Sequence, residues 1–469
     1  MGSAPVAARP DVSRRHPIAR AVAARGADAT DKALTLPRGR GVALAARWWG
    51  HLWRWGSEPW VHQVLAVFVA SRIGFALVTY LGYVLLLAPK YSTGSVGLSG
   101  LLDAWNQWDA TRYLGIAAHG YPTPDVTAFF PLYPLLIAGI TAPVGGQGAY
   151  AVSLVIANLA FLGALLLLRV LVAARWGAST AERAVVYLTV FPTALYTFAP
   201  YNESLFLLWT IGCFVALSRR RWALAGGLGA LATLTRPAGL LLLIPFAYEW
   251  WLIAHPVAAL PGWALARRGT GQRRSEPPAN GREVAKVARG MRPVAGIGAL
   301  AWGLLMPAAL GAFATFCAWR FGDPLAFLHA QAQWNRVSQW PWVGLWWQVT
   351  GLLRAAPASF FQIHDLLDLS ATVGFIALWV AGWRRLPRAQ LLYMGGLLLL
   401  ALSSPGGVHL HTNDPLTSNQ RFVLEMFPGF ILLAVLTERR PRWHQAIVLL
   451  STMLLATLTL VFILGRWLV

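Results

Sequence analysis

Apolar runs that approach or exceed the length needed to cross a lipid bilayer recur along most of this chain. About 20 consecutive apolar residues span the hydrocarbon core as an α-helix, and residues 61–88 form the first such run. A membrane β-barrel would instead show shorter segments of alternating polarity. Only 12% of the residues are charged and 57% are hydrophobic, whereas a soluble domain carries about 25% charged residues. The sequence therefore predicts an all-α polytopic membrane protein.

The distribution of positive charge predicts the orientation of the chain. Cytoplasmic segments of membrane proteins are enriched in Lys and Arg, so the net charge of +21 need not indicate nucleic acid, and no nucleic-acid partner is expected. Residues 1–58 are predicted to be a disordered, basic, cytoplasmic arm, and residues 59–469 a transmembrane catalytic domain. The basic segment 254–295 is expected in the cytoplasm. Three loops are expected outside: 89–128, the aromatic loop 320–366 with amphipathic helices, and 405–420.

Eleven membrane spans and one re-entrant segment are predicted. The apolar run within 129–146 has only about 13 residues, a length at which re-entrant segments compete with spans. The expected spans are about 61–88, 150–172, 182–199, 201–217, 222–235, 238–253, 296–319, 367–384, 389–404, 421–437 and 444–465.

One external stretch is unusually rich in hydrogen-bonding side chains. It reads Trp105-Asn106-Gln107-Trp108-Asp109-Ala110-Thr111-Arg112-Tyr113, in a chain with only 18 acidic residues. The carboxylate of Asp109 has the chemistry of a general base for an acceptor hydroxyl. The indoles of Trp105 and Trp108 offer flat faces for a sugar ring. The alternative is that Asp109 simply pairs with Arg112, three residues later, on a helix surface.

The predicted topology brings further polar residues to the same external face. Arg236 and Arg421 are candidate ligands for a donor phosphate, because guanidinium matches phosphate geometry. The alternatives are that Arg236 only marks a hairpin at Pro237 and that Asn202-Glu203 only caps a helix. The remaining candidates for substrate contact are Arg112, His119, Tyr201, Asn202, Glu203, His409, His411 and Gln420.

His409 and His411 have a spacing that could bind a metal ion. No third ligand is apparent beyond Asp414, so solvated histidines are preferred and no metal site is predicted. Cys213 and Cys317 both lie inside apolar runs and suggest neither a disulfide framework nor a CxxC metal site.

Several of these motifs resemble those of the PIG-V (GPI mannosyltransferase 2-like) family, which are polytopic glycosyltransferases of the GT-C type. The resemblance spans about residues 60–440. It is carried by Gln107-Trp108-Asp109-Ala110, Ala128-Phe129-Phe130-Pro131, Phe191-Pro192-Thr193-Ala194, Tyr201-Asn202-Glu203-Ser204-Leu205, Leu234-Thr235-Arg236-Pro237-Ala238-Gly239 and Ser418-Asn419-Gln420-Arg421-Phe422.

The resemblance implies a GT-C fold and a mannosyl donor carried on polyprenyl or dolichyl phosphate. It further implies an inverting, metal-independent transfer without a cofactor, and it places the acidic residue of the first external loop, here Asp109, at the catalytic centre. The arm 1–58 and the loop 254–295 have no counterpart in the family. The Ala-, Arg- and Gly-rich composition suggests a bacterial plasma membrane, where no GPI anchor is expected, so the acceptor is a glycolipid, a cell-wall glycan or a protein.

Two alternatives to a mannosyltransferase facing outside are kept open. A flippase or transporter for a lipid-linked sugar would need charged or broken helices near the bilayer midplane and often an inverted repeat, and no repeat is recognised. The other alternative is a GT-C transferase that adds a different sugar.

Overall fold

A computed structural model describes residue 2 and residues 58–90, 97–254, 297–334, 336–406 and 415–466. The chain divides into two units, Met1–His62 and Gln63–Val469, and the helical bundle belongs to the second. Within the described ranges every regular element is a helix, and the only β-type pairing there is an isolated bridge between Arg336 and Gly406. The all-α architecture is therefore confirmed for this part of the chain. The predicted arm 1–58 and loop 254–295 fall almost entirely outside the described residues.

In the described ranges, six helical segments are long and apolar enough to cross a membrane. They are α3 (Pro59–Leu87), α7 (Ala149–Trp176), η5 (Pro237–Leu242) with α11 (Leu243–Ala254), α14 (Ile297–Ala301) with η6 (Trp302–Leu304) and α15 (Leu305–Phe321), α18 (Phe360–Gly382) and α22 (Pro441–Ile463). Four shorter apolar segments join them: α6 with η3 (Leu132–Val144), α9 (Glu203–Ser218), α10 (Trp222–Thr235) and α19 (Arg388–Leu402).

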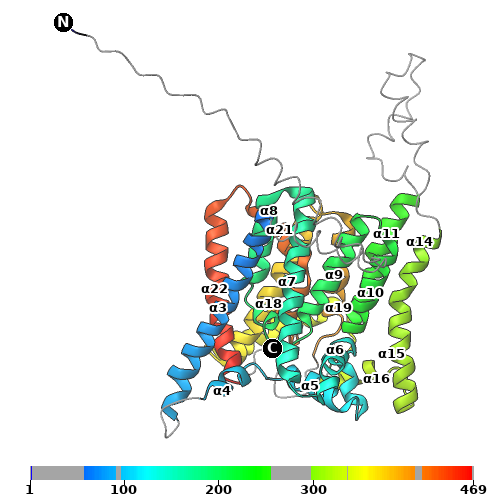
Figure 1. Ribbon diagram of the computed structural model, residues 1–469, viewed down its shortest axis with the longest axis horizontal. Coiled ribbons are helices and arrows are strands. Elements are labelled where there is room, and N and C mark those ends of the chain that lie inside the picture. Colours follow the sequence, from blue (N-terminus) through cyan, green and yellow to red (C-terminus); the bar gives the residue numbers. More distant parts are fainter. Residues whose placement is uncertain are drawn as a thin grey trace, which may run out of the picture. The chain divides into compact units, whose positions relative to one another are not determined.

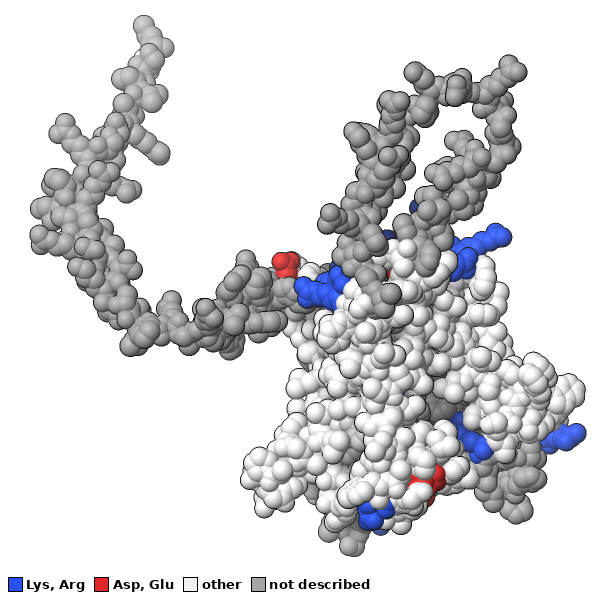
Figure 2. Space-filling model, turned by 90° about the vertical axis from the view of Figure 1, so that its right-hand side faces the viewer, with Lys and Arg blue, Asp and Glu red and all other residues white. Residues whose placement is uncertain are grey.

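The long helices run side by side, and the short helices α4 (Leu98–Asp103), α5 (Asp109–His119) and α16 (Ala326–His329) gather at one end of the bundle (Figure 1). On the face shown in Figure 2, charged side chains lie toward the two ends and a band of uncharged residues separates them. This arrangement is typical of a bundle that crosses a bilayer. The multi-span character is confirmed, and the count of eleven spans stays a prediction.

Two expected spans are interrupted by a turn or a sharp bend. The segment 182–199 contains α8 (Ala178–Thr189), which ends before Phe191-Pro192 and is followed by the 3-10 turn η4 (Ala194–Thr197). The segment 421–437 is broken as well: α20 with η8 (Asn419–Glu425) meets α21 (Phe427–Thr437) at 77°. Pro192 explains the first break, because proline disfavours helical backbone in the preceding residue and has no N–H to donate. The second break lies at Met426 (φ −82°, ψ 58°), because in a continuous helix the ring of Pro428 would clash with the carbonyl of Leu424.

The segment 320–366 contains the expected amphipathic helix, α17 (Pro341–Arg354). Trp342, Trp346 and Leu353 are exposed along one side of α17, whereas Gly344 and Gln348 are buried on the other. The end of the expected loop belongs to α18, which begins at Phe360.

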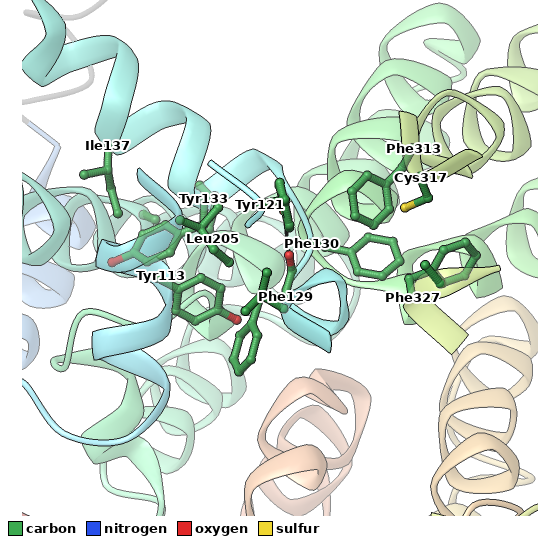
Figure 3. Close-up of a cluster of buried hydrophobic side chains, with 14 residues drawn as sticks. Tyr113, Tyr121, Phe129, Phe130, Tyr133, Ile137, Leu205, Phe313, Cys317 and Phe327 are labelled. Atoms are coloured by element: carbon green, nitrogen blue, oxygen red, sulfur yellow. Dashed lines mark hydrogen bonds between the residues drawn. The ribbon is translucent and has the colours of Figure 1, made fainter. Parts of the chain in front are cut away.

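An aromatic cluster attaches α5 to the rest of the bundle (Figure 3). The ring of Tyr113 meets that of Tyr133 edge to face at 5.1 Å, and the Tyr133 hydroxyl donates to the carbonyl of Ser153 in α7 at 2.9 Å. Phe130, two residues before α6, packs against Phe313 of α15 at 4.9 Å. Each such aromatic pair contributes about 0.5–1.5 kcal/mol beyond the area it buries. The start of α5 is thereby fixed relative to α6, α7 and α15.

Candidate active site

Charged side chains of the candidate site lie where helices begin. Asp109 is the first residue of α5 and Glu203 is the first residue of α9. A helix N-terminus carries partial positive charge, so it stabilises a carboxylate placed there. Trp108, which precedes Asp109, has φ 55°, a conformation that is costly for a bulky side chain. The hydroxyl of Tyr201 holds this turn by donating to the carbonyl of Gln107 at 2.9 Å.

Arg236 lies at a helix break, and Arg421 lies in a short helix that precedes one. Arg236 separates α10 from η5 in extended conformation (φ −153°, ψ 144°), because Pro237 disfavours helical backbone before it. Arg421 belongs to α20 (Asn419–Phe422), and the backbone N–H of Gln420 in the same turn donates to Asp368 Oδ1 of α18 at 2.7 Å. The hydroxyl of Thr193 donates to the carbonyl of Gln420 at 2.7 Å. Two other parts of the bundle thus fix the turn that carries Arg421.

Five charged side chains from these segments form a chain of alternating sign. Arg421 Nη1 donates to Asp109 Oδ2 at 2.6 Å, and Arg421 Nε donates to Glu203 Oε1. Arg236 Nη1 donates to the same Glu203 oxygen at 3.2 Å and to Glu425 Oε1. The order is therefore Asp109, Arg421, Glu203, Arg236 and Glu425, with Glu203 bridging the two arginines.

Burial makes this mutual compensation necessary. The Glu203 side chain is 0% exposed, and the side chains of Arg421 and Asp109 are 10% and 24% exposed. A buried ion without a partner costs several kcal/mol, so the alternation allows five charges to share one region. The guanidinium of Arg421 also lies 4.9 Å from the ring centroid of Tyr196 and 4.8 Å from that of Tyr201. These contacts hold its plane between the two carboxylates.

A cavity of about 430 Å³ opens against this charged chain. Its polar wall includes Asp109, Arg236, Arg421, Glu425 and a third guanidinium, that of Arg336. Its apolar wall comes mainly from η5, α19 and the segment around α16. The apolar lining residues include Ala238, Leu240, Leu241, Phe327, Leu328, Leu397, Leu400 and Ala401. The cavity therefore suits a ligand with a polar or anionic group and an apolar part.

Two further polar groups line this cavity. Asn202 donates from Nδ2 to the carbonyl of Thr235 at 2.9 Å, and its buried Oδ1 has no hydrogen-bond partner among the described residues. A buried acceptor without a partner is a place where a ligand hydroxyl would be favourable. Tyr113 also lines the cavity, and burial, reinforced by the nearby Asp109 carboxylate, raises the pKa of its phenol well above the usual value. Tyr113 therefore stays protonated and able to donate.

The structure brings six of the residues expected at the site together. Asp109, Asn202, Arg236 and Arg421 line the cavity, and Glu203 and Tyr201 contact Arg421 directly behind its wall.

The other expected residues that the structure describes do not line the cavity. Trp105 is 2% exposed, packs against Phe198 and donates from its indole to Thr79 at 3.0 Å. Arg112 and His119 are exposed residues of α5 that do not line the cavity. Trp108 is 38% exposed beside Asp109. Gln420 is buried and supports the turn of Arg421 through its backbone, and His409 and His411 lie outside the described residues.

Sequence reasoning missed Glu425 and gave Arg336 no place in the site. Glu425 follows Arg421 by four residues inside an otherwise apolar segment, and an ionisable residue in such a segment is a functional candidate by default. That signal was available. The placement of Arg336 was not readable, because its guanidinium joins the site through the carbonyls of Ser404 at 3.1 Å and Thr417 at 3.2 Å.

Comparison with known proteins identifies a family over part of the chain. Residues 85–248 match the family model described as Mannosyltransferase (PIG-V). The chain is 33% identical to mouse GPI alpha-1,6-mannosyltransferase 2 over 163 residues, which cover 33% of this chain and 33% of that protein. It is 30% identical to the protein of the same name from Cricetulus griseus over 208 residues, 40% of this chain and 42% of the relative. The matched segments thus span less than half the length of these relatives.

Solved structures with a similar outline include two of the oligosaccharyltransferase of Archaeoglobus fulgidus. The apo form gives a TM-score of 0.39, at 14% identity, over 86% of this chain and 56% of that chain. The complex of that enzyme, AglB, with an inhibitory peptide and a dolichol-phosphate gives 0.40, with the same identity and coverage. A likeness at this level supports no inference about the site.

Proposed function

The chain belongs to the PIG-V mannosyltransferase family, and on this premise we propose that it transfers mannose from a polyprenyl-phosphate donor to a hydroxyl of a lipid or glycan acceptor. The observation that carries the proposal is the cavity with a charged wall and an apolar wall. A polyprenyl-phosphate sugar has the same division, because its phosphate and sugar are polar and its chain is apolar. The transfer is assigned to the outer face of a bacterial plasma membrane, in keeping with the expected topology.

The proposed reaction is a single displacement. The acceptor oxygen forms a bond to C1 of mannose while the bond from C1 to the phosphate oxygen breaks, and polyprenyl phosphate leaves with the electron pair. The proton of the acceptor hydroxyl passes to the carboxylate of Asp109, which acts as general base. Attack opposite to the leaving group inverts the configuration at C1. No metal ion or cofactor enters this scheme.

Arginine supplies the counter-charge for the leaving group in this proposal. Arg236 and Arg421 lie on the cavity wall and are already bonded to carboxylates. A guanidinium has five N–H donors, so each can bind phosphate while keeping a carboxylate partner. In a region with little water, these hydrogen bonds strengthen as negative charge develops on the phosphate. Arg336 adds a third cation on the same wall.

The direct test is transfer by the purified full-length protein. The protein is incubated with radiolabelled polyprenyl-phosphate-mannose and a lipid extract, and the released polyprenyl phosphate and the labelled product are quantified. We expect stoichiometric release of polyprenyl phosphate and label in the acceptor fraction. Competition with polyprenyl-phosphate donors of other sugars tests the assignment of mannose.

A flippase would give a different result in the same preparation. It would move the labelled donor across the bilayer of reconstituted vesicles without cleaving it. Translocation of intact donor, with no polyprenyl phosphate released, would overturn the proposed transferase. Transfer from another sugar donor in preference to mannose would keep the reaction and change the substrate.

A further inference from the structure

An arginine lies in the middle of the first long apolar helix. Arg72 is part of α3 (Pro59–Leu87), a helix of 29 residues with a mean hydropathy of 2.0 in its most apolar window. A charged side chain at such a depth is costly and marks a functional hypothesis by default. Arg72 also lies outside residues 85–248, the segment that matches the family.

Neutral groups surround the Arg72 guanidinium. Its Nε donates to Asn158 Oδ1 of α7 at 2.9 Å, its Nη2 to the carbonyl of Thr197 at 2.9 Å, and its Nη1 to the hydroxyl of Ser71 at 3.0 Å. The rings of Phe68 and Phe161 lie 4.3 Å and 4.8 Å from the guanidinium carbon. No carboxylate is recorded as its ion-pair partner in the described part of the chain. Neutral hydrogen-bond acceptors and the faces of aromatic rings therefore stabilise the charge of Arg72.

The partners of Arg72 belong to the segment that leads into the candidate site. The carbonyl of Thr197, at the end of η4, accepts from Arg72 and also from the hydroxyl of Ser204 at 3.2 Å. Asn158 in turn donates to the carbonyl of Phe198 at 3.1 Å. Arg72 and Asn158 thus hold two successive carbonyls, and Ser204 ties the same point to the first turn of α9.

The segment that Arg72 and Asn158 hold, residues 196–203, carries the side chains that orient Arg421. Tyr196 lies within η4, Tyr201 follows it, and both rings contact the Arg421 guanidinium, at 4.9 Å and 4.8 Å. Glu203, next to Ser204, accepts a hydrogen bond from Arg421 Nε. A displacement of η4 would therefore move the two rings and the carboxylate that fix Arg421, and with them its bond to Asp109.

We propose that Arg72 is a positioning residue for the reaction. It fixes the segment 196–203 through the carbonyl of Thr197 and, by way of Asn158, the carbonyl of Phe198, and thereby sets the orientation of Arg421 toward Asp109. The proposal rests on the proposed function, because the reaction it serves is the proposed transfer. The fork of the guanidinium explains why arginine stands here: three of its nitrogens reach three partners at once, which a lysine ammonium on its flexible stem does not reproduce.

The test uses three variants of the full-length protein in lipid nanodiscs. Arg72→Met keeps an unbranched chain of similar length and removes the charge, and Arg72→Lys keeps the charge and loses the fork. Arg169→Met is the matched control, because Arg169 is also an arginine of a long helix, α7, and pairs with Glu182 at 3.7 Å. The readouts are kcat and donor KM, the melting temperature, and hydrogen exchange of the backbone amides of 194–204.

A positioning role predicts that stability and activity separate. In Arg72→Met we expect an unchanged or higher melting temperature, since an internal charge is removed, together with faster exchange at 194–204. We expect kcat to fall about tenfold to a hundredfold, as for a misplacement of reacting groups by about 1 Å, and donor KM to change much less. Arg72→Lys should not restore kcat. Arg169→Met should keep both kcat and the exchange of 194–204.

Three results would overturn the proposal. One is wild-type kcat and wild-type exchange in Arg72→Met. Another is full activity in Arg72→Lys, which would show that charge rather than the fork matters. The third is a parallel loss of melting temperature and kcat in both Arg72→Met and Arg169→Met, which would show a merely structural role. If the wild-type protein transfers no sugar, the proposed function fails, and the exchange measurement still decides whether Arg72 holds the segment.

Discussion

Arg421 and Arg72 are two partly or wholly buried arginines whose charges are accommodated in opposite ways. Arg421 lies in a short helix that precedes a break, between the carboxylates of Asp109 and Glu203, on the wall of a cavity. Arg72 lies in an unbroken helix and contacts a carbonyl, an amide, a hydroxyl and aromatic rings. An arginine side chain therefore takes part in a series of ion pairs at Arg421, whereas at Arg72 it donates to several neutral groups.

The difference shows what helix breaks contribute to this protein. Asp109, Glu203, Arg236, Arg421 and Glu425 all lie at helix starts, breaks or short turns, where backbone irregularity lets charged side chains approach one another. A side chain on an intact helix contacts mainly the side chains of neighbouring helices, because the carbonyls of regular helices are already hydrogen-bonded. Arg72 reaches the carbonyl of Thr197 only because η4 is itself irregular. The ion pairs of the site therefore lie at irregular segments, and Arg72 of the intact helix α3 contacts one of these segments, at η4.

The largest expected effect is on activity, in Asp109→Asn. The amide keeps the shape of the side chain but accepts no proton, and general acid–base catalysis contributes about 10²–10⁴-fold. We expect the initial transfer rate to fall by this factor while the protein stays folded, because Arg421 keeps its bond to Glu203. Asp103→Asn, the same substitution at an exposed position six residues earlier, is the control and should keep the wild-type rate. Retention of more than half the activity in Asp109→Asn would assign the base elsewhere.

The next effect is on stability, in Glu203→Gln. This carboxylate bridges both arginines and is fully buried, and breaking a buried pair by removing one partner costs about 3–5 kcal/mol. Thermal unfolding in nanodiscs measures the loss. Glu182→Gln is the comparison, because the Glu182 side chain is 43% exposed where it pairs with Arg169, and exposed pairs contribute about 0–1 kcal/mol. Equal losses in the two variants would contradict the central role given to Glu203.

A smaller effect is expected on donor binding, in Arg421→Lys. The ammonium keeps the charge but cannot reproduce the planar fork that bonds Asp109 and Glu203 and contacts the rings of Tyr196 and Tyr201. Loss of one hydrogen bond to a charged group corresponds to about 1.5–3 kcal/mol, so we expect donor KM to rise at least about tenfold. The donor KM is measured from the transfer rate at increasing donor concentrations. An unchanged KM would place the donor phosphate away from Arg421.

The smallest effects are expected at the outer face of α5. Arg112→Ala and His119→Ala change exposed side chains that do not line the cavity. Such surface substitutions usually change the free energy of unfolding by no more than about 0.5 kcal/mol. The transfer rate and the melting temperature should therefore both match those of the wild-type protein. A marked loss of rate in Arg112→Ala alone would favour a role for this arginine toward the acceptor.

Part of the site was readable from local sequence and part was not. Asp109, Arg236 and Arg421 were readable because a charged residue in an apolar context, or before a proline, is conspicuous whatever its partners are. Their pairing was not readable, since Asp109 and Arg421 are separated by 312 residues. The surface pairing of Asp109 with Arg112 was a local alternative, and the recorded partner of Asp109 is Arg421 instead. Trp105 was expected at the site but is used in packing instead. Its indole donates to Thr79 and contacts the rings of Phe75 and Phe198.

The sequence by itself determined that the described part of this protein is an all-helical, multi-span bundle with polar motifs near the ends of its apolar segments, because the length and hydrophobicity of an apolar run favour a membrane-spanning helix whatever that run packs against. The breaks at Pro192, Pro237 and Pro428 follow from local backbone sterics in the same way. Only the tertiary structure decided which charges compensate one another, which wall of the cavity is apolar, and that Arg72 reaches the carbonyl of Thr197. Ionic and hydrogen-bond partners depend on distances of a few ångströms between segments far apart in the chain, and these distances are set by packing.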